Sequence, residues 1–196
     1  MDCILTGAAQ SGRTSILVAL LRLWKCRSVP ATTWLPEGSP SRWRLRLPDE
    51  EHRLYRLRPP GGFLGVELAA PPLGLSGRRW LFLELPGLLE DPEDQVERKA
   101  MAEALGRLVT ADVVVHVVDA ARTGEEGSPR EIDTALFRLL QAKRKYLVMA
   151  NKVDEAAAAE GLAIVRQCAQ GGEVVASSAL VGQGIRQLRT FLASLS

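Results

Sequence analysis

Residues 3–14 read Cys-Ile-Leu-Thr-Gly-Ala-Ala-Gln-Ser-Gly-Arg-Thr, and this stretch decides the fold. Its first four residues form an apolar run of strand length, and apolar side chains recur at helical spacing from Thr14 to Trp24. Between the two, Gly7 and Gly12 frame a loop with the spacing of a phosphate-binding P-loop. The stretch therefore predicts a strand, a glycine loop and a helix whose N-terminus can hold phosphate.

The chemistry of such a loop assigns roles to its residues. Glycines let successive backbone N–H groups point at phosphate oxygens, and a threonine hydroxyl can bind magnesium. Thr14 takes the magnesium position, whereas Arg13 stands where lysine is usual. The predicted nucleotide contacts are Gly7, Gln10, Ser11, Gly12, Arg13, Thr14 and Ser15. Taken alone, the segment also fits a glycine turn in front of an ordinary helix.

The chain beyond Trp80 alternates apolar strands with helices. We expect strands at 80–83, 113–118, 146–150 and 174–176, and helices at 93–109, 131–143, 155–169 and 185–195. Continuous apolar strands separated by helices favour a mainly parallel sheet that is covered on both faces. In such folds the ligand lies beyond the carboxyl ends of the strands, so the loops after the strands should carry the function.

One of these loops is Asn151-Lys152-Val153-Asp154, directly after the strand expected at 146–150. A single carboxylate can accept both N–H donors on one edge of guanine, N1–H and the exocyclic amine, and adenine does not offer this pair. Asp154 is therefore the predicted guanine contact. Asn151 can reach N7 of the base and brace the loop, while the stem of Lys152 lies along the base. The alternative is a polar loop in which Asp154 caps the next helix.

The loop after the last expected strand begins with two serines. Small residues at this place let backbone amides approach the base oxygen, and the predicted contacts are Ser178, Ala179 and Leu180. A serine-rich turn before a helix explains the same residues without any ligand.

The segment at about 30–79 has a different composition. Ten of the eleven prolines fall between Pro30 and Pro92, and the apolar residues there show no helical periodicity. Strict alternation at 42–47 and a weaker alternation at 52–58 predict two strands of a half-exposed antiparallel sheet. Arginines recur in both stretches with Trp43 and Tyr55 interleaved: Arg42, Arg44, Arg46, Arg53, Arg56 and Arg58. They fit either an RNA-binding face or a solvated face of the sheet.

Length and composition restrict the class of protein. The chain has 196 residues, suited to one domain, and its formal net charge is only +2, so no global charge points to nucleic acid or a membrane. No run approaches the roughly 20 apolar residues that span a bilayer, and three widely spaced cysteines suit a reducing compartment. We expect a cytoplasmic protein with no membrane segment. His116, inside an apolar run, is expected to be a hydrogen-bonded core residue rather than a catalytic one.

On these motifs the chain resembles the translation-factor class of small GTPases, especially the Era and TrmE branch. The segments that carry the resemblance are GAAQSGRTS, ADVVVHVVDAA, NKVD and SSALVGQGIRQL. The resemblance implies a three-layer α/β P-loop NTPase fold, a G domain over 1–196, with a mainly parallel sheet, one antiparallel edge and a β-rich switch and hairpin insert at about 30–79. It also implies GTP or GDP as ligand, Mg²⁺ as cofactor and a protein effector or activator as partner.

Two further family elements contact magnesium and the γ-phosphate, and here one is ambiguous and the other is altered. Thr32 or Thr33 fits the threonine of a mobile loop after the first helix, with a simple turn as the alternative, and Thr33 is the predicted metal ligand. Glu84-Leu85-Pro86-Gly87 replaces aspartate-x-x-glycine. Glu84 is then the predicted acidic group near magnesium, and Gly87 offers its amide to the γ-phosphate.

The residues expected to support hydrolysis also differ. Leu88 stands after Gly87, where a glutamine could orient the attacking water. Some relatives with an apolar residue here use K⁺ bound by a P-loop asparagine, a place that Gln10 takes in this chain. The guanidinium of Arg13 is broader than a lysine ammonium. The sequence thus predicts a GTP/GDP switch with slow or partner-assisted hydrolysis, or alternatively a degenerate G domain that acts as a non-hydrolysing binding or scaffold module.

Overall fold

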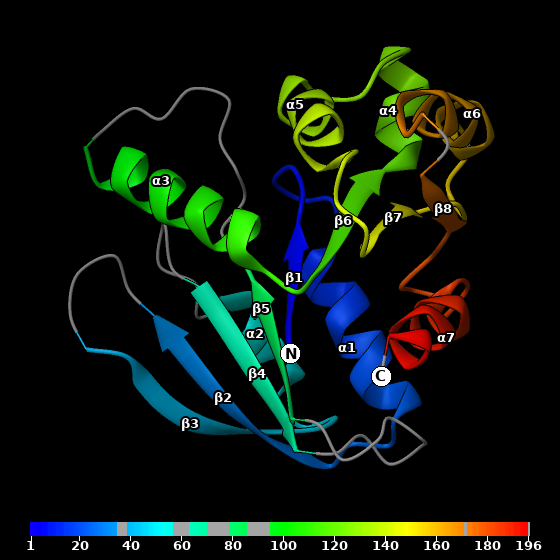
Figure 1. The fold of residues 1–196 in the computed structure, drawn as a ribbon. Helices are drawn as coiled ribbons and strands as arrows, with labels where there is room; N and C mark the ends of the chain where they lie inside the picture. Colours follow the sequence, from blue (N-terminus) through cyan, green and yellow to red (C-terminus); the bar gives the residue numbers. More distant parts are fainter. Residues whose placement is uncertain (35–38, 57–62, 70–78, 86–94, 171, 196) are drawn as a thin grey trace.

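An eight-stranded sheet runs through the part of the chain that the computed structural model describes, residues 1–34, 39–56, 63–69, 79–85, 95–170 and 172–195 (Figure 1). Its strands are β1 (Asp2–Thr6), β2 (Ser28–Trp34), β3 (Ser41–Arg46), β4 (Phe63–Ala69), β5 (Arg79–Glu84), β6 (Val113–Asp119), β7 (Tyr146–Asn151) and β8 (Glu173–Ala176). The spatial order is β3-β2-β4-β5-β1-β6-β7-β8. Strands β5, β1, β6, β7 and β8 are parallel, and β4, β2 and β3 extend the sheet with antiparallel pairs. The predicted mainly parallel sheet with an antiparallel edge is confirmed.

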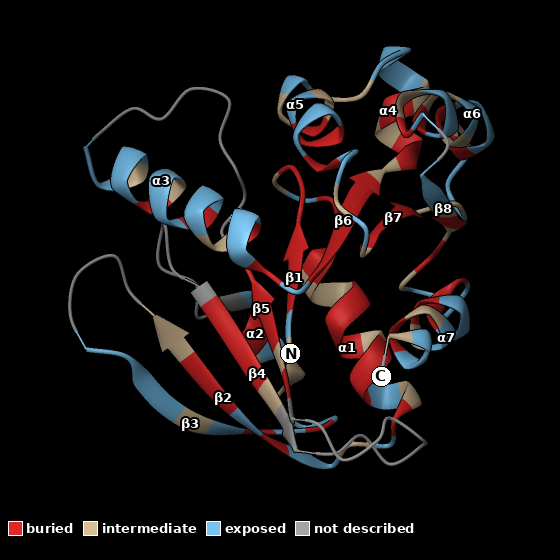
Figure 2. Cartoon of the chain, viewed as in Figure 1, coloured by how far each residue is buried: buried red, intermediate tan, exposed pale blue. Residues whose placement is uncertain are grey.

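Helices cover both faces of this sheet. They are α1 (Arg13–Leu23), α2 (Glu51–Arg56), α3 (Gln95–Thr110), α4 (Ala120–Glu126), α5 (Glu131–Leu140), α6 (Ala158–Cys168) and α7 (Ile185–Ser194). Strand β6 shows how one strand serves both layers: Val113, Val115 and Val117 pack with residues of α1, α2 and α7. Val114 and Val118 pack with residues of α3, α4, α5 and α6. Figure 2 shows the central strands buried between the two layers, as the three-layer prediction requires.

One element of the insert differs from its prediction. The strand expected at 52–58 is wrong, because Glu51–Arg56 form the helix α2 and residues 57–62 lie outside the described part. Leu54 is the buried residue of this short helix and packs in the same cluster as α1. An ion pair between Glu51 and Arg22 ties α2 to α1. Alternation over so few residues does not separate a strand from a short helix with one buried side chain.

The loop or turn expected around Thr32 and Thr33 is also wrong, since both lie in β2. This strand is paired on both sides: Thr33 faces Ser41 of β3 and Leu64 of β4. Val29 and Ala31 of the strand are buried. Pairing with two neighbours stabilises a strand whose sequence, with a proline in it, predicts none.

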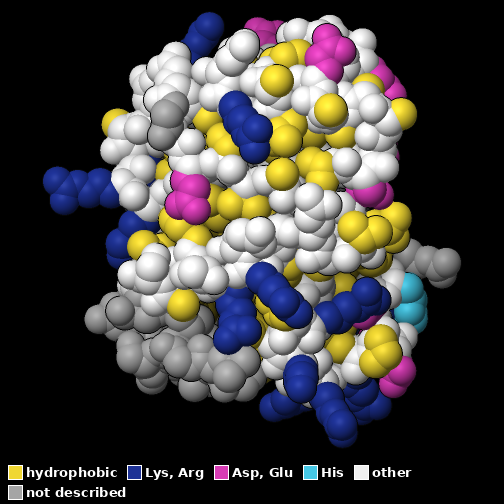
Figure 3. Space-filling view, turned by 90° about the vertical axis from the view of Figure 1, so that its right-hand side faces the viewer, with side chains coloured by type: hydrophobic (Ala, Val, Ile, Leu, Met, Phe, Trp, Pro, Cys, Tyr) yellow, Lys and Arg dark blue, Asp and Glu magenta, His cyan; other side chains and the backbone are white. Residues whose placement is uncertain are grey.

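The arginines of β3 lie on the edge strand of the sheet. Arg42, Arg44 and Arg46 are exposed, while Trp43 donates a hydrogen bond from Nε1 to Thr33 and lies under the guanidinium of Arg53. Figure 3 shows Lys and Arg side chains gathered in the lower part of one face. Charges on an edge strand prevent pairing with another sheet, which is a structural role for them. In the described part of the chain, no helix has the length and apolar character needed to cross a membrane.

Candidate nucleotide-binding site

At two positions in the loop between β1 and α1, the backbone adopts a conformation that favours glycine. Gly7 has φ 137° and Gly12 has φ 96°, both outside the range that other residues readily adopt. A Cβ at Gly7 would lie 2.1 Å from the carbonyl oxygen of Val117, and one at Gly12 would lie 2.2 Å from Nδ2 of Asn151. Helix α1 starts at the next residue, Arg13, so its N-terminal N–H groups open onto this loop.

A buried hydrogen-bond network holds the start of this loop. The carboxylate of Asp133 in α5 accepts from the backbone N–H of Ala8, at 3.0 Å, and lies 2.9 Å from Nε2 of His116. On its other side, His116 Nδ1 lies 2.9 Å from the hydroxyl of Tyr146. Burial, and next the charge of Asp133, raise the pKa of Tyr146, so its hydroxyl keeps its proton, and the carboxylate of Asp133 can only accept. His116 then donates from Nε2, as a core histidine with both nitrogens bonded.

Replacing Asp133 with alanine should lower the free energy of unfolding by about 2–6 kcal/mol, because two buried donors lose their acceptor and each costs about 1–3 kcal/mol. The affected donors are Ala8 N–H and His116 Nε2–H. Urea denaturation measures the loss, and Glu131→Ala, an exposed acid in the first turn of the same helix, is the control. A loss below about 0.5 kcal/mol, the usual limit for surface changes, would contradict the role of Asp133.

Asn151 joins the glycine loop to the loop after β8. Its side chain is 2% exposed and donates from Nδ2 to the carbonyl of Ser11, at 2.9 Å. Its Oδ1 accepts from the backbone N–H of Ala179, at 3.1 Å. The neighbouring Lys152 forms an ion pair with Asp119, the N-cap of α4. The three loops that the sequence singled out after strands β1, β7 and β8 are therefore in direct contact.

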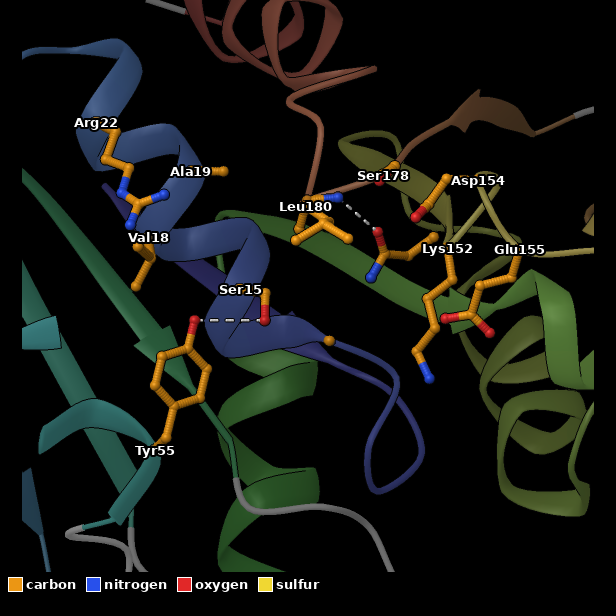
Figure 4. A pocket seen from close by; sticks show the side chains of 13 residues that line it. Ser15, Val18, Ala19, Arg22, Tyr55, Lys152, Asp154, Glu155, Ser178 and Leu180 are labelled. Carbon is orange, nitrogen blue, oxygen red and sulfur yellow. Dashed lines mark hydrogen bonds between the residues drawn. The ribbon is translucent and has the colours of Figure 1, made fainter. Parts of the chain in front are cut away.

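A pocket of about 360 Å³ opens between these loops and helices α1 and α2 (Figure 4). Of the predicted nucleotide contacts, eight line it: Gly12, Ser15, Asn151, Lys152, Asp154, Ser178, Ala179 and Leu180. Asp154 is exposed, and Figure 4 shows its carboxylate pointing inward between Leu180 and Lys152. Five residues that no motif indicated also line the pocket: Val18, Ala19, Arg22, Tyr55 and Glu155.

The remaining residues of the glycine loop lie around the start of α1. Gln10 is exposed with φ 65°. Ser11 is 1% exposed, and its hydroxyl has no hydrogen-bond partner among the described residues. A buried hydroxyl without a partner calls for an explanation, and a bound ligand or water is the usual one.

Arg13 and Thr14 both contact the end of β5. Arg13 is buried and donates from Nη1 to the carbonyl of Leu85, at 2.9 Å. The hydroxyl of Thr14 donates to Oε1 of Glu84, also at 2.9 Å. The structure thus brings two predicted magnesium residues, Thr14 and Glu84, together at the start of α1, and it directs the unusual arginine at the adjacent carbonyl.

The structure does not bring Thr33 to this place. Strands β4 and β5 lie between β2 and β1, and a strand spacing of about 4.8 Å puts β2 about 14 Å from β1. The hydroxyl of Thr33 accepts the bond from Trp43 described above. Gly87 and Leu88 lie outside the described residues. The metal role of Thr33 and the phosphate role of Gly87 stay predictions.

The parallel sheet, the glycine loop at the N-terminus of α1 and the adjoining polar loops define a nucleotide-binding protein of the P-loop class. Residues 2–152 match the family described as 50S ribosome-binding GTPase, and the chain belongs to this family. It is a small P-loop GTPase of the translation-factor class.

Two GTPases are among the curated relatives of this chain. It is 28% identical over 144 residues to GTPase Era of Maricaulis maris, covering 66% of this chain and 46% of that protein. It is 33% identical over 127 residues to GTPase Obg of Akkermansia muciniphila, covering 61% of this chain and 35% of that protein. The aligned region thus spans less than half the length of each relative.

Solved structures with a similar fold include the G domain of the FeoB iron transporter of T. maritima, with a TM-score of 0.59 at 18% identity, covering 100% of this chain and 98% of that chain. Aquifex aeolicus Era bound to GDP and AlF₄⁻ has a TM-score of 0.59 at 18% identity, covering 99% of this chain and 56% of that chain. At this identity the likeness concerns the fold, which is that of a G domain.

Proposed function

We propose that this chain binds a guanine nucleotide in the pocket between the glycine loop and Asp154, and that it works as a GTP/GDP switch. The observation that carries the proposal is the pocket itself, which unites a helix N-terminus with the carboxylate of Asp154. Phosphates bind readily at a helix N-terminus, and a carboxylate pairs with N1–H and the exocyclic amine of guanine. The two features lie on opposite parts of one pocket, as the two ends of a nucleotide require.

The other residues of the site have roles that fit this placement. Asn151 braces the base loop through its two hydrogen bonds, and the N–H of Ala179 would exchange its bond to Asn151 for one to the base oxygen. Lys152 lies along the base while its ammonium pairs with Asp119. Ser11, whose buried hydroxyl has no partner among the described residues, gains one when phosphate enters the loop.

Magnesium fits the pair formed by Thr14 and Glu84. Mg²⁺ is usually bound through one or two protein oxygen ligands together with phosphate oxygens and water, and a hydroxyl next to a carboxylate supplies that kind of set. Bound there, the ion would neutralise charge between the phosphates. Thr33 is a proposed third ligand, and to take part it must leave its pairing with β3 and β4 as well as its bond to Trp43.

Calorimetric titration tests the proposed ligand. We expect GDP to bind at least about a hundredfold more tightly than ADP, because ADP leaves Asp154 without its paired donors. ATP and GTP, titrated with Mg²⁺, should show the same preference. Equal affinities for GDP and ADP would remove the guanine assignment and leave only a phosphate site.

Hydrolysis is proposed to be slow or to depend on a partner. Arg13 is bonded to Leu85, and holding phosphate competes with this bond, so we expect weaker phosphate contacts than a lysine gives. The competing proposal is a non-hydrolysing scaffold. Phosphate release from GTP, measured with Na⁺ and with K⁺, separates the two. Release stimulated by K⁺ would support a cation at Gln10, while no release with either ion, beside normal GDP binding, would favour the scaffold.

The setting of this activity is also part of the proposal. We propose a cytoplasmic role beside a protein activator or RNA, with residues 1–196 acting as one G domain, and the family's description as ribosome-binding supports the RNA partner. The exposed arginines of β3 would be the RNA contact. RNA retention that falls steeply with salt would support this role.

A further inference from the structure

Tyr55 lies at the pocket although no motif places it there. It comes from α2, in the segment between β3 and β4, and it lines the pocket with Ser15, Val18, Ala19 and Arg22 of α1. Its hydroxyl donates to Oγ of Ser15, at 3.4 Å. Figure 4 shows the phenol reaching the first turn of α1 from the side opposite to Asp154 and Lys152. The side chain is 53% exposed, which is high for an aromatic ring beside a pocket.

The position of Tyr55 is set by contacts on the other faces of α2. Leu54, the adjacent residue, is 2% exposed and anchors the helix in the core. Glu51 accepts both guanidinium bonds from Arg22 of α1. Arg53 lies over the ring of Trp43, with 4.9 Å from the guanidinium carbon to the ring centroid. These contacts fix the helix without using the phenol, so Tyr55 is held at the pocket with its ring uncovered.

We propose that Tyr55 is a nucleotide contact whose ring covers the sugar of the bound guanine nucleotide. The inference rests on the proposed function. With the base at Asp154 and the phosphates at the N-terminus of α1, the sugar lies between them, beside Ser15. The phenol bonded to Ser15 offers an apolar face there, and burying that face on binding stabilises the complex. Helix α2 thereby supplies a wall of the pocket that the glycine loop and the base loops lack.

The test measures GDP dissociation constants for the wild type, Tyr55→Ala, Tyr55→Phe and the control His52→Ala, an exposed residue on the same helix. Tyr55→Ala should bind GDP about tenfold more weakly, because the apolar ring face that the sugar would bury is lost. Tyr55→Phe keeps the ring and should lie within about threefold of wild type, because a bond of 3.4 Å is weak. His52→Ala should be unchanged.

A second measurement separates contact from structure. Because Tyr55 is half exposed, Tyr55→Ala should leave the melting temperature without nucleotide unchanged. Glu51→Gln weakens the tie between α2 and α1 and should lose part of the same affinity through the positioning of Tyr55.

The outcomes are distinct. Wild-type affinity in Tyr55→Ala overturns the contact while leaving the proposed function intact. Equal losses in Tyr55→Phe and Tyr55→Ala overturn the role of the ring. No GDP binding by the wild type overturns the proposed function itself, and with it this inference.

Discussion

Replacing Asp154 with asparagine should weaken GDP binding by about a hundredfold or more, because each hydrogen bond to a charged partner is worth about 1.5–3 kcal/mol and two are affected. The asparagine amide still accepts from N1–H, but its Nδ2 donor faces the exocyclic amine of guanine. In xanthine a carbonyl oxygen replaces that amine. The variant should therefore prefer xanthosine diphosphate, which titration of both nucleotides against both proteins measures.

Glu155 provides a matched control for this exchange. It follows Asp154 in the chain, lines the same pocket and carries the same charge. Glu155→Gln should keep the preference for GDP with little change in affinity. If both variants lose GDP affinity to the same degree, the effect comes from the charge of the pocket rather than from pairing with the base. The role assigned to Asp154 would then be wrong.

A side chain at position 12 should abolish nucleotide binding. In Gly12→Val the new Cβ would meet Nδ2 of Asn151 at 2.2 Å, at a φ of 96° that valine does not tolerate. Asn151 must move, which breaks its bonds to Ser11 and Ala179 and separates the glycine loop from the base loop. We expect GDP affinity to fall by more than about a thousandfold, since phosphate and base contacts are lost together.

Gly106 is the control for this change. It lies in α3, and a Cβ there would meet nothing within 4 Å. Gly106→Ala should leave GDP binding unchanged and stabilise the helix slightly, because the helix propensity of alanine exceeds that of glycine by about 1 kcal/mol. Near-normal GDP binding by Gly12→Val would show that the loop tolerates a side chain, contrary to the steric argument.

The parallel half of the fold could be predicted because its strands are continuous apolar runs. Strand β6 alone places valines on both faces of the sheet, and a short run rich in β-branched residues favours a strand over a helix. The insert could not be predicted in the same way. β2 is stabilised by partners on both sides, and α2 by one buried leucine and an ion pair to α1, which are tertiary contacts without a local signal.

The same distinction applies to the site. Residues in loops after strands could be found, since the topology of a parallel sheet brings those loops to one edge. Tyr55 and Arg22 could not be found, because they reach the pocket from helices. The spacing of residues along these helices shows no ligand-binding motif. Asp133 was missed for a related reason: one acidic residue in the first turn of a helix looks like a surface charge, and only the packing of α5 buries it against Ala8.

The central claim is that the carboxylate of Asp154 holds the guanine edge while the N-terminus of α1 holds the phosphates. A crystal structure of the protein with GDP tests it most directly. We expect N1 and the exocyclic amine within hydrogen-bonding distance of the two Asp154 oxygens, with the phosphates at Gly12 and Arg13. A base bound away from Asp154, or phosphates outside the glycine loop, would contradict it.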